Sequence, residues 1–289
     1  MNKAFFTTLL IMSFYSNAIV IKHDKNDFNY KTNINEFPPL ATFYVGGAHG
    51  SLIAPKWILT AAHASFCIEK GSKVEINGKL ETIENLFIHK LYKPGSSHDI
   101  ALVELAQAVQ AVKPAIIETK NNELNKQVWF IGIGGTGNGL IGETVDNFAN
   151  KGVLRKAQNQ VTYAQGPLLK FKFDNGSEAL PLEGVSGGGD SGGPAYIKTK
   201  SGIKVLGISS RFEKGGIGKY GIDEVYTRVS YFNDWIHEVI YHPNPSSLAS
   251  VTTKLSQSKL PAGLTTEMLP MVCKDITITQ PVVKSNTSD

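Results

Sequence analysis

The stretch Gly-Gly-Gly-Asp-Ser-Gly-Gly-Pro at residues 187–194 constrains what this chain can fold into more than any other segment. A glycine loses more backbone entropy on folding than a residue with a side chain, so a serine ringed by glycines is unfavourable for folding alone. Glycines also supply positive φ angles and bare N–H groups, which can converge on an oxyanion that develops beside a nucleophile. The stretch therefore predicts that Ser191 is a functional nucleophile rather than an ordinary turn serine.

Two upstream segments carry residues that could act together with Ser191. An apolar run from residue 51 ends in Thr-Ala-Ala-His, where His63 is a candidate general base. Further on, Asp99 enters a mostly apolar strand pattern at residues 100–105, and a buried acid in such a place needs a polar partner. The chain order His63, Asp99, Ser191 is one of those in which a Ser-His-Asp triad occurs on unrelated folds.

These three segments resemble the trypsin and chymotrypsin family of serine endopeptidases. The family's marks Thr-Ala-Ala-His, Asp-Ile-Ala-Leu and Gly-Asp-Ser-Gly-Gly-Pro are all unbroken. The resemblance runs from about residue 19 to residue 242. Further matches in the same order lie at residues 37–40, 132–134, 207–210, 225–229 and 235–236.

The resemblance implies an all-β fold of two packed six-stranded antiparallel β-barrels with a C-terminal helix. It implies that Ser191 attacks the peptide carbonyl, that His63 transfers the proton and that Asp99 holds the imidazole. An acyl-enzyme would form, and the N–H groups of Gly189 and Ser191 would make the oxyanion hole. The implied substrates are proteins or peptides, and no metal or organic cofactor is needed.

Local patterns agree with an all-β chain. Runs rich in Val, Ile, Phe, Tyr and Thr alternate with Gly, Asn, Lys and Pro clusters. A helix is predicted over residues 231–242, because apolar residues follow helical spacing there. The predicted strands cover residues 40–45, 57–60, 74–76, 100–105, 128–133, 168–173, 205–208 and 225–229.

The two ends of the chain differ from this protease-like part. Residues 1–18 have a basic start, an apolar run and small residues before a cleavage point, so they are interpreted as a signal peptide. Residues 19–242 form the expected protease domain. Residues 243–289 are rich in Ser, Thr, Lys and Pro and are expected to be a poorly ordered tail without a membrane span.

Charge and cysteine content restrict partners and location. The net charge of +4 is well mixed, so we expect no nucleic-acid partner. We expect a secreted monomer, periplasmic or extracellular, with no membrane contact after signal cleavage. Few cysteines and an Asn- and Lys-rich composition favour a bacterial exported protein. In the family a cysteine directly follows the histidine, but Ala64 stands there, and the sequence leaves open whether Cys67 and Cys273 pair.

Substrate specificity is where the sequence departs from its family. Val185 occupies the pocket-base position at which trypsin-like members carry an aspartate, which disfavours a plain trypsin pocket. Ser210 and Phe212 stand on the pocket wall, where Phe212 would narrow the entrance. Aligned without a gap, Glu224 takes the rear-wall position of the pocket and would attract a cation. The segment is about two residues longer than usual in the family, so Gly221 is the alternative residue for that position.

Family members also mature by exposing a new N-terminus whose ammonium pairs with the aspartate before the nucleophile. Asp190 is that residue here, and signal cleavage after Ala18 would expose Ile19-Val20. The sequence therefore predicts an Ile19–Asp190 ion pair made without a propeptide. One feature counts against this ion pair, because Ile21-Lys22 stands where the family has a flexible Gly-Gly.

Other readings of the chain are weaker or stay open. Residues 132–137 satisfy G-x-G-x-x-G, but the following glycines break any helix that a dinucleotide site would need. Four other histidines, His23, His49, His89 and His98, have no match in the family motifs and are assigned surface or structural roles. A catalytically silent binding protein and a narrowly selective processing protease remain alternatives.

Overall fold

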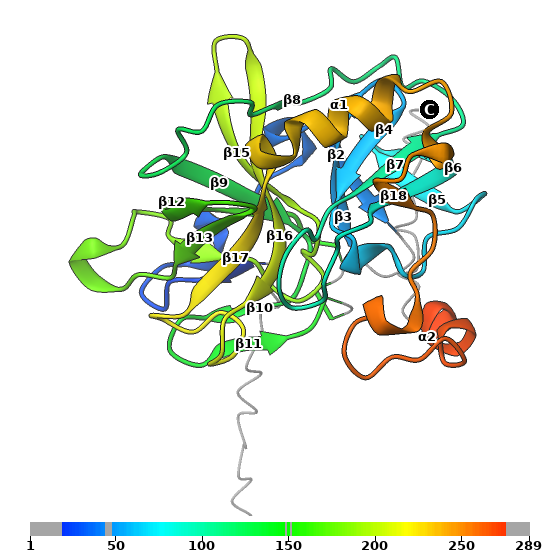
Figure 1. Cartoon of the computed structure of the whole chain (residues 1–289). Helices are drawn as coiled ribbons and strands as arrows, with labels where there is room; N and C mark the ends of the chain where they lie inside the picture. The colour runs from blue at the N-terminus through cyan, green and yellow to red at the C-terminus, as the bar shows by residue number, and fades with distance from the viewer. Residues whose placement is uncertain (1–18, 44–47, 148, 151, 276–289) are drawn as a thin grey trace, which may run out of the picture.

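The computed structural model describes residues 19–43, 48–147, 149–150 and 152–275, and two β-barrels packed side by side make up most of it (Figure 1). The interpreted signal peptide and the last residues of the tail, 276–289, lie outside this described part. Each barrel has six antiparallel strands, which confirms the fold class expected from the sequence.

The first barrel has the strand order β6-β5-β2-β3-β4-β7 and closes through pairing of β6 with β7. A short strand, β18 (Val251–Thr252), extends it at the free side of β6. The barrel strands are β2 (Leu40–Phe43), β3 (His49–Ala54), β4 (Trp57–Thr60), β5 (Lys73–Ile76), β6 (Lys79–His89) and β7 (Ala101–Leu105).

The second barrel has the order β15-β9-β12-β13-β17-β16 and closes through β15 and β16, with β8 (Ile116–Ile117) added in parallel to β16. Its strands are β9 (Gln127–Gly132), β12 (Arg155–Gln165), β13 (Leu168–Lys172), β15 (Pro194–Thr199), β16 (Gly202–Phe212) and β17 (Asp223–Arg228). A smaller sheet joins β11 (Gly142–Val145), β10 (Thr136–Asn138), β1 (Ile19–Ile21) and β14 (Gly184–Val185), in that order.

The helices are few and short. The α-helices are α1 (Asn233–Tyr241), within the range predicted from periodicity, and α2 (Leu269–Asp275). Single 3-10 turns lie at Asp27–Asn29, Ile34–Glu36, His63–Ser65, Gly176–Glu178, Val229–Phe232, Pro245–Ser247 and Gln257–Lys259.

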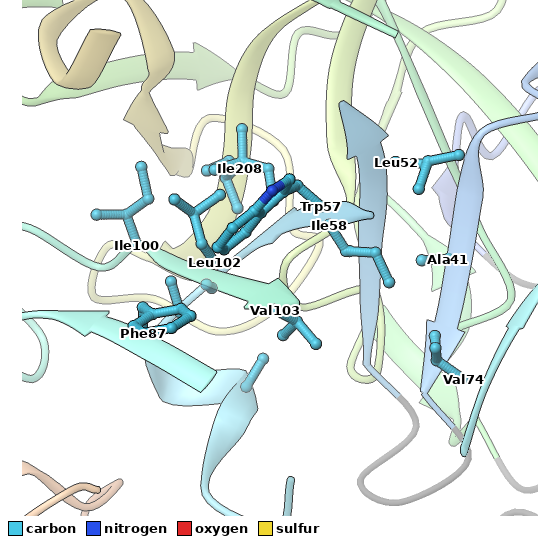
Figure 2. Close-up of a cluster of buried hydrophobic side chains, with 14 of the residues drawn as sticks. Ala41, Leu52, Trp57, Ile58, Val74, Phe87, Ile100, Leu102, Val103 and Ile208 are labelled. Atoms are coloured by element: carbon cyan, nitrogen blue, oxygen red, sulfur yellow. The ribbon is translucent and has the colours of Figure 1, made fainter. Parts of the chain in front are cut away.

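Each barrel is filled by the inward side chains of its strands. In the first, Ile58, Phe87 and Leu102 are fully buried, and Figure 2 shows them among the side chains of facing strands. In the second, the ring of Phe130 stacks on Tyr226 with centroids 5.0 Å apart and meets Phe171 edge-on at 4.9 Å. The first cluster also includes Ile131, Tyr196 and Ile208 of the second barrel, so the two barrels pack against each other through apolar side chains.

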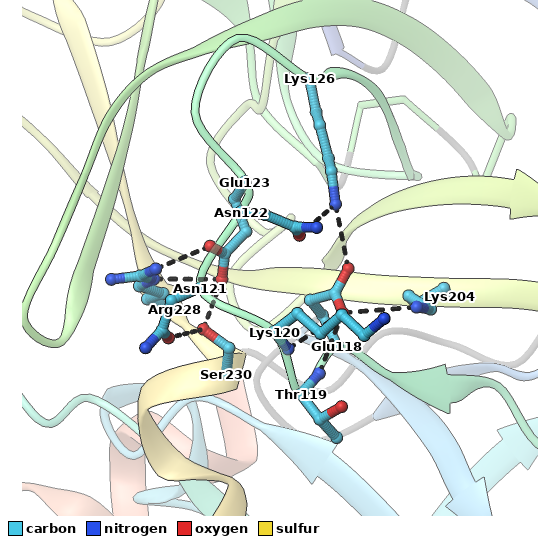
Figure 3. A network of polar contacts seen from close by, with 10 residues as sticks. All are labelled: Glu118, Thr119, Lys120, Asn121, Asn122, Glu123, Lys126, Lys204, Arg228 and Ser230. Atoms are coloured by element: carbon cyan, nitrogen blue, oxygen red, sulfur yellow. Dashed lines mark hydrogen bonds and ion pairs between the residues drawn. The ribbon is translucent and has the colours of Figure 1, made fainter.

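The segment that connects the barrels is fixed by two buried carboxylates. Glu123 pairs with Arg228 at 2.7 Å and accepts a hydrogen bond from Ser230, and Glu118 pairs with Lys126 and Lys204 at 3.1 and 3.3 Å (Figure 3). Burial opposes ionisation of Glu123, but its partners keep its pKa below the usual value. The connection is therefore held firmly against the second barrel.

The C-terminal segment differs from the expectation of a poorly ordered tail. Within residues 243–275, β18 pairs with β6, and the indole of Trp235 donates a hydrogen bond to the Ser250 carbonyl at 3.3 Å. Val251 and Leu260 are both buried. These apolar residues are too isolated in the sequence to form a periodic pattern, which is why composition alone suggested disorder. A disulfide then joins Cys273 to Cys67.

Candidate active site

His63 and Asp99 are held together by the first barrel. His63 begins the short helical turn that follows β4, and its own backbone N–H donates to Asp99 Oδ1 at 2.8 Å. Its Nδ1 lies 2.7 Å from Asp99 Oδ2. Ser210 of the second barrel donates a further hydrogen bond to Asp99 Oδ2 at 2.6 Å. The imidazole is therefore fixed in orientation by a carboxylate that is itself anchored from both barrels.

Ser191 reaches the other side of the same imidazole from the second barrel. Its Oγ lies 2.8 Å from His63 Nε2. The Ser191 carbonyl accepts a hydrogen bond from the His49 N–H at 2.8 Å, which ties the serine loop to β3. The structure thus brings Ser191, His63 and Asp99 into one continuous series of polar contacts.

The charges in this series reinforce one another. Burial alone would lower the pKa of His63, but the attraction of Asp99 and the hydrogen bond to it raise that pKa above its usual value. Burial would raise the pKa of Asp99, but His63 and the hydrogen bond from Ser210 hold it below the usual range. Asp99 is therefore ionised at neutral pH, and His63 is a stronger base than a free imidazole.

The residues around Ser191 leave two amides available. Gly189 has φ +94°, and a Cβ at this position would lie 2.7 to 2.9 Å from atoms of the Asn147 side chain, so glycine is required. Neither the Gly189 nor the Ser191 N–H has an acceptor within the described part of the chain. Two unpaired N–H groups on this loop are what stabilisation of an oxyanion requires.

Asp190 is buried directly behind the serine. Its carboxylate accepts hydrogen bonds from the Gly134 N–H at 2.7 Å and the Gly187 N–H at 2.8 Å. A Cβ at Gly132 or Gly134 would lie within 2.7 Å of the carboxylate, so two glycines of the G-x-G-x-x-G match make room for it. Burial raises the pKa of Asp190 to about 7. This carboxylate is therefore placed to gain from a nearby cation.

Strand β1 lies alongside the segments that donate to Asp190. Ile19 pairs with Thr136, two residues after Gly134, and Val20 pairs with Val185, two residues before Gly187. Ile19 is fully buried and has φ 65°. A β-branched residue rarely adopts this left-handed conformation, so the backbone at Ile19 is strained while a peptide bond precedes it.

A pocket of about 410 Å³ opens beside Ser191. Of the predicted specificity residues, Ser210 and Phe212 are among those that line it. Val185 and Glu224 are not; both are fully buried. Val185 packs with Val20 and Phe173, and the Phe212 ring lies against that cluster. The apolar base predicted from Val185 is therefore covered and is not the floor of this pocket.

Glu224 lies behind the pocket wall. It pairs with Phe212 across β16 and β17. Its carboxylate accepts hydrogen bonds from the Ser186 N–H at 3.0 Å and from Ser209 Oγ at 3.3 Å. Burial raises the pKa of Glu224 to about 8, so the proton is largely retained at neutral pH.

The remaining histidines lie outside this polar series. His49 is buried beneath the serine loop, where its Nε2 accepts from the Ile133 N–H at 3.2 Å. His89 and His98 pack on each other and on Phe232, and His23 contacts Tyr220. In the described part of the chain no three or more His, Cys, Asp or Glu side chains gather as a metal site would need.

Sequence reasoning missed two side chains at the site. Glu143 accepts a hydrogen bond from the Gly188 N–H, and Asn147 lies against Gly189. Both belong to the segment after residue 137, which carries no family motif, so nothing in the sequence marked them.

Of the helices in the described ranges, none has the length and apolar character to cross a membrane.

Comparison with known proteins places this geometry in a family. The Trypsin family model matches residues 28–236. A trypsin of Phaedon cochleariae is 31% identical over 243 residues, which cover 76% of this chain and 87% of that trypsin. Serine protease SSP1 of Scolopendra subspinipes is 28% identical, covering 67% and 73% of the two chains. Human chymotrypsin-like elastase family member 3A is 30% identical, covering 66% and 77%.

The family model and these relatives agree with the two-barrel fold. Their shared chemistry is hydrolysis of peptide bonds in protein substrates. This chain belongs to the trypsin family and is a serine-type endopeptidase.

Proposed function

We propose that this endopeptidase hydrolyses peptide bonds through a Ser191-His63-Asp99 triad and an acyl-enzyme intermediate. The observation that carries the proposal is the unbroken polar series from Ser191 Oγ, through both nitrogens of His63, to the Asp99 carboxylate at 2.8 and 2.7 Å. A serine with a base in hydrogen-bond reach, and a base oriented by a third group, is the arrangement that nucleophilic catalysis requires.

The proposed reaction has two balanced halves. Ser191 Oγ bonds to the substrate carbonyl carbon while His63 Nε2 takes the hydroxyl proton, and the N–H groups of Gly189 and Ser191 bind the oxyanion. The C–N bond then breaks, and His63 returns the proton to the leaving amine. Water repeats the sequence on the acyl-serine, with His63 again as base, and releases the acid. Asp99 stays ionised throughout and holds the imidazole tautomer.

We further propose that the active form begins at Ile19, whose ammonium pairs with Asp190. The pairing of β1 beside the Asp190 donors supports this, as do the buried carboxylate and the strained φ of Ile19, which would be relieved once no peptide bond precedes it. Signal cleavage after Ala18 would create this end and accompany export as a secreted monomer.

Covalent labelling tests the proposed nucleophile. A fluorophosphonate probe should label the processed protein at Ser191, and peptide mapping should find the adduct on that residue. Ser191→Ala should lose both labelling and casein hydrolysis, while Ser201→Ala, on an exposed hairpin, should keep both. Labelling that persists in Ser191→Ala would reject the triad. A folded wild-type protein that neither labels nor cleaves would favour the silent binding protein.

The narrowly selective processing protease is the second candidate, and one observation favours it. Phe212 lines the pocket beside Ser191 and at the same time packs on the cluster that covers Val185. Phe212 and this cluster therefore separate the pocket from Val185, the residue at the family's usual pocket-base position. Such an enzyme would label with the probe but cleave few casein bonds.

A further inference from the structure

The pocket beside Ser191 carries charged side chains that the catalytic chemistry does not use. Arg211, Glu213 and Lys214 line it together with Ser191, Ser210 and Phe212. Arg211 is the residue directly after Ser210, which is fixed by its hydrogen bond to Asp99. Arg211 therefore stands on β16 next to a residue of the catalytic hydrogen-bond series and lines the same pocket as the nucleophile.

The three lining charges do not cancel. Glu213 is engaged by Lys170, whose Nζ lies 3.1 Å from Glu213 Oε1 and 3.9 Å from Asp223. The side chains of Arg211 and Lys214, by contrast, form no ion pair or hydrogen bond with any residue in the described ranges. Arg211 is only partly exposed, so its charge is not simply dispersed into open solvent. The pocket therefore presents two uncompensated cations.

The nearby acids do not supply the missing partners. Glu143 is held by the Gly188 N–H on the neighbouring loop, and burial raises its pKa. Glu224 is fully buried behind Ser209, and its pKa of about 8 keeps it largely protonated at neutral pH. Among the residues that line the pocket, Glu213 is thus the one acid, and Lys170 already pairs with it, while Arg211 and Lys214 are two cations.

We propose that Arg211, assisted by Lys214, is a specificity residue that binds a carboxylate of the peptide substrate, so that this endopeptidase prefers an Asp or Glu among the four residues on the acyl side of the scissile bond. The proposal rests on the proposed function of the same site. A guanidinium offers a planar pair of donors that matches both oxygens of a carboxylate, and such charge-assisted pairs are stronger than neutral hydrogen bonds. Phe212 limits the length of side chain that can enter.

Matched peptides test the proposal. Internally quenched peptides carry Glu, Gln or Lys in turn at each of the four positions on the acyl side of the scissile bond. At one of these positions the wild-type enzyme should cleave the Glu peptide with a kcat/KM at least tenfold above that of the Gln peptide, and the Lys peptide should be poorest. The preference should weaken as salt concentration rises, because part of it is electrostatic.

Variants assign the preference to the pocket cations. Arg211→Gln should bring the Glu-to-Gln ratio of kcat/KM close to one, Lys214→Gln should reduce it by a smaller factor, and Arg211→Glu should favour the Lys peptide. Lys200→Gln removes a lysine from an exposed hairpin of the same barrel and should keep the wild-type ratio. Equal cleavage of Glu and Gln peptides at every position, or a ratio unchanged in Arg211→Gln, would overturn the proposal.

A binding measurement separates this proposal from the catalytic one. Fluorescence anisotropy on folded Ser191→Ala protein reports peptide affinity without turnover, and the Glu peptide should bind at least fivefold more tightly than the Gln peptide. Equal affinities together with normal probe labelling of wild-type Ser191 would reject the acidic specificity alone. Tighter binding of the Glu peptide by a protein that never labels would reject the triad but keep the pocket assignment.

Discussion

Ser210 Oγ donates a hydrogen bond of 2.6 Å to the same Asp99 oxygen that lies 2.7 Å from His63 Nδ1. One oxygen of the Asp99 carboxylate is therefore in contact with a residue of each barrel. Removing the hydroxyl leaves Asp99 less firmly oriented, and a hydrogen bond to a charged group is worth about 1.5 to 3 kcal/mol. We expect Ser210→Ala to lower kcat/KM roughly tenfold, measured with a short ester substrate. An unchanged kcat/KM would show that Asp99 does not depend on this bond.

The pH profile should reveal the charge of Asp99. His63 must be neutral to accept a proton, and Asp99 raises its pKa above the usual value, so activity should fall as pH decreases through that raised pKa. In Asp99→Asn the charge is lost, the pKa of His63 falls, and the acidic limb of kcat/KM should move to lower pH while kcat drops about 10⁴-fold. An acidic limb that stays in place would argue against coupling between the two residues.

Asp190 is expected to control activity without contacting substrate. Its carboxylate accepts two backbone hydrogen bonds, and an amide there would satisfy only one of them and could not pair with the Ile19 ammonium. Asp190→Asn should therefore retain less than about 1% of wild-type kcat/KM with Ser191 intact, since stranding a buried charge costs roughly 3 to 5 kcal/mol. Glu178→Gln, at an exposed acid, serves as the control and should be fully active.

The start of the mature chain checks the same ion pair independently. N-terminal sequencing of active exported protein should read Ile19-Val20-Ile21. A fully active sample that begins at any other residue would contradict maturation by signal cleavage alone.

Glu224 should make the folded protein less stable as pH rises. Burial raises its pKa from 4.5 to about 8, so the folded state keeps a proton that the unfolded chain releases. The free energy of unfolding should therefore decrease between about pH 4.5 and pH 8, by an amount on the order of a few kcal/mol. Thermal melts of Ser191→Ala protein measure this slope, and adding Glu224→Gln should make it shallower, while Asp190, whose pKa is also raised, keeps part of it. An equally steep slope in the double variant would mean that Glu224 titrates normally.

The disulfide between Cys67 and Cys273 should stabilise the fold through the C-terminal segment. Replacing both cysteines with serine is expected to cost roughly 2 to 4 kcal/mol in the free energy of unfolding, since cross-links restrict the unfolded chain. Urea denaturation provides the measurement. Alkylation of both thiols in native, unreduced protein, detected by mass spectrometry, would contradict the pairing.

Much of the fold could be predicted because its strands carry simple patterns. The strand over Trp57–Thr60 was predicted with its observed ends, since all four of its residues are buried. β12 was not predicted, although it spans Arg155–Gln165. Its inward face includes Arg155 and Asn159, whose polar groups form hydrogen bonds such as that from Arg155 to Asp27. A strand whose buried side is partly polar gives no hydrophobic alternation to read.

Some residues of the candidate site could likewise be predicted from the sequence, and others could not. His63, Asp99 and Ser191 stand in short local motifs, so the sequence could nominate them. Glu213 lines the pocket with Arg211 but pairs with Lys170, which comes from a distant part of the sequence. The spacing of residues along the chain does not predict that contact. The covering of Val185 by residues of β1 and by Phe173 likewise became visible only when distant segments were brought together.

The Cys67–Cys273 link also bears on how this protease survives its own activity. It encloses nearly all of the chain after His63, with a sequence separation of 206 residues, and both Asp99 and Ser191 lie inside that span. An autolytic cut in any surface loop between the two cysteines would leave the fragments covalently joined. A nicked molecule would thus keep its base and its nucleophile on one particle, and would separate into pieces on a gel only after a reductant is added.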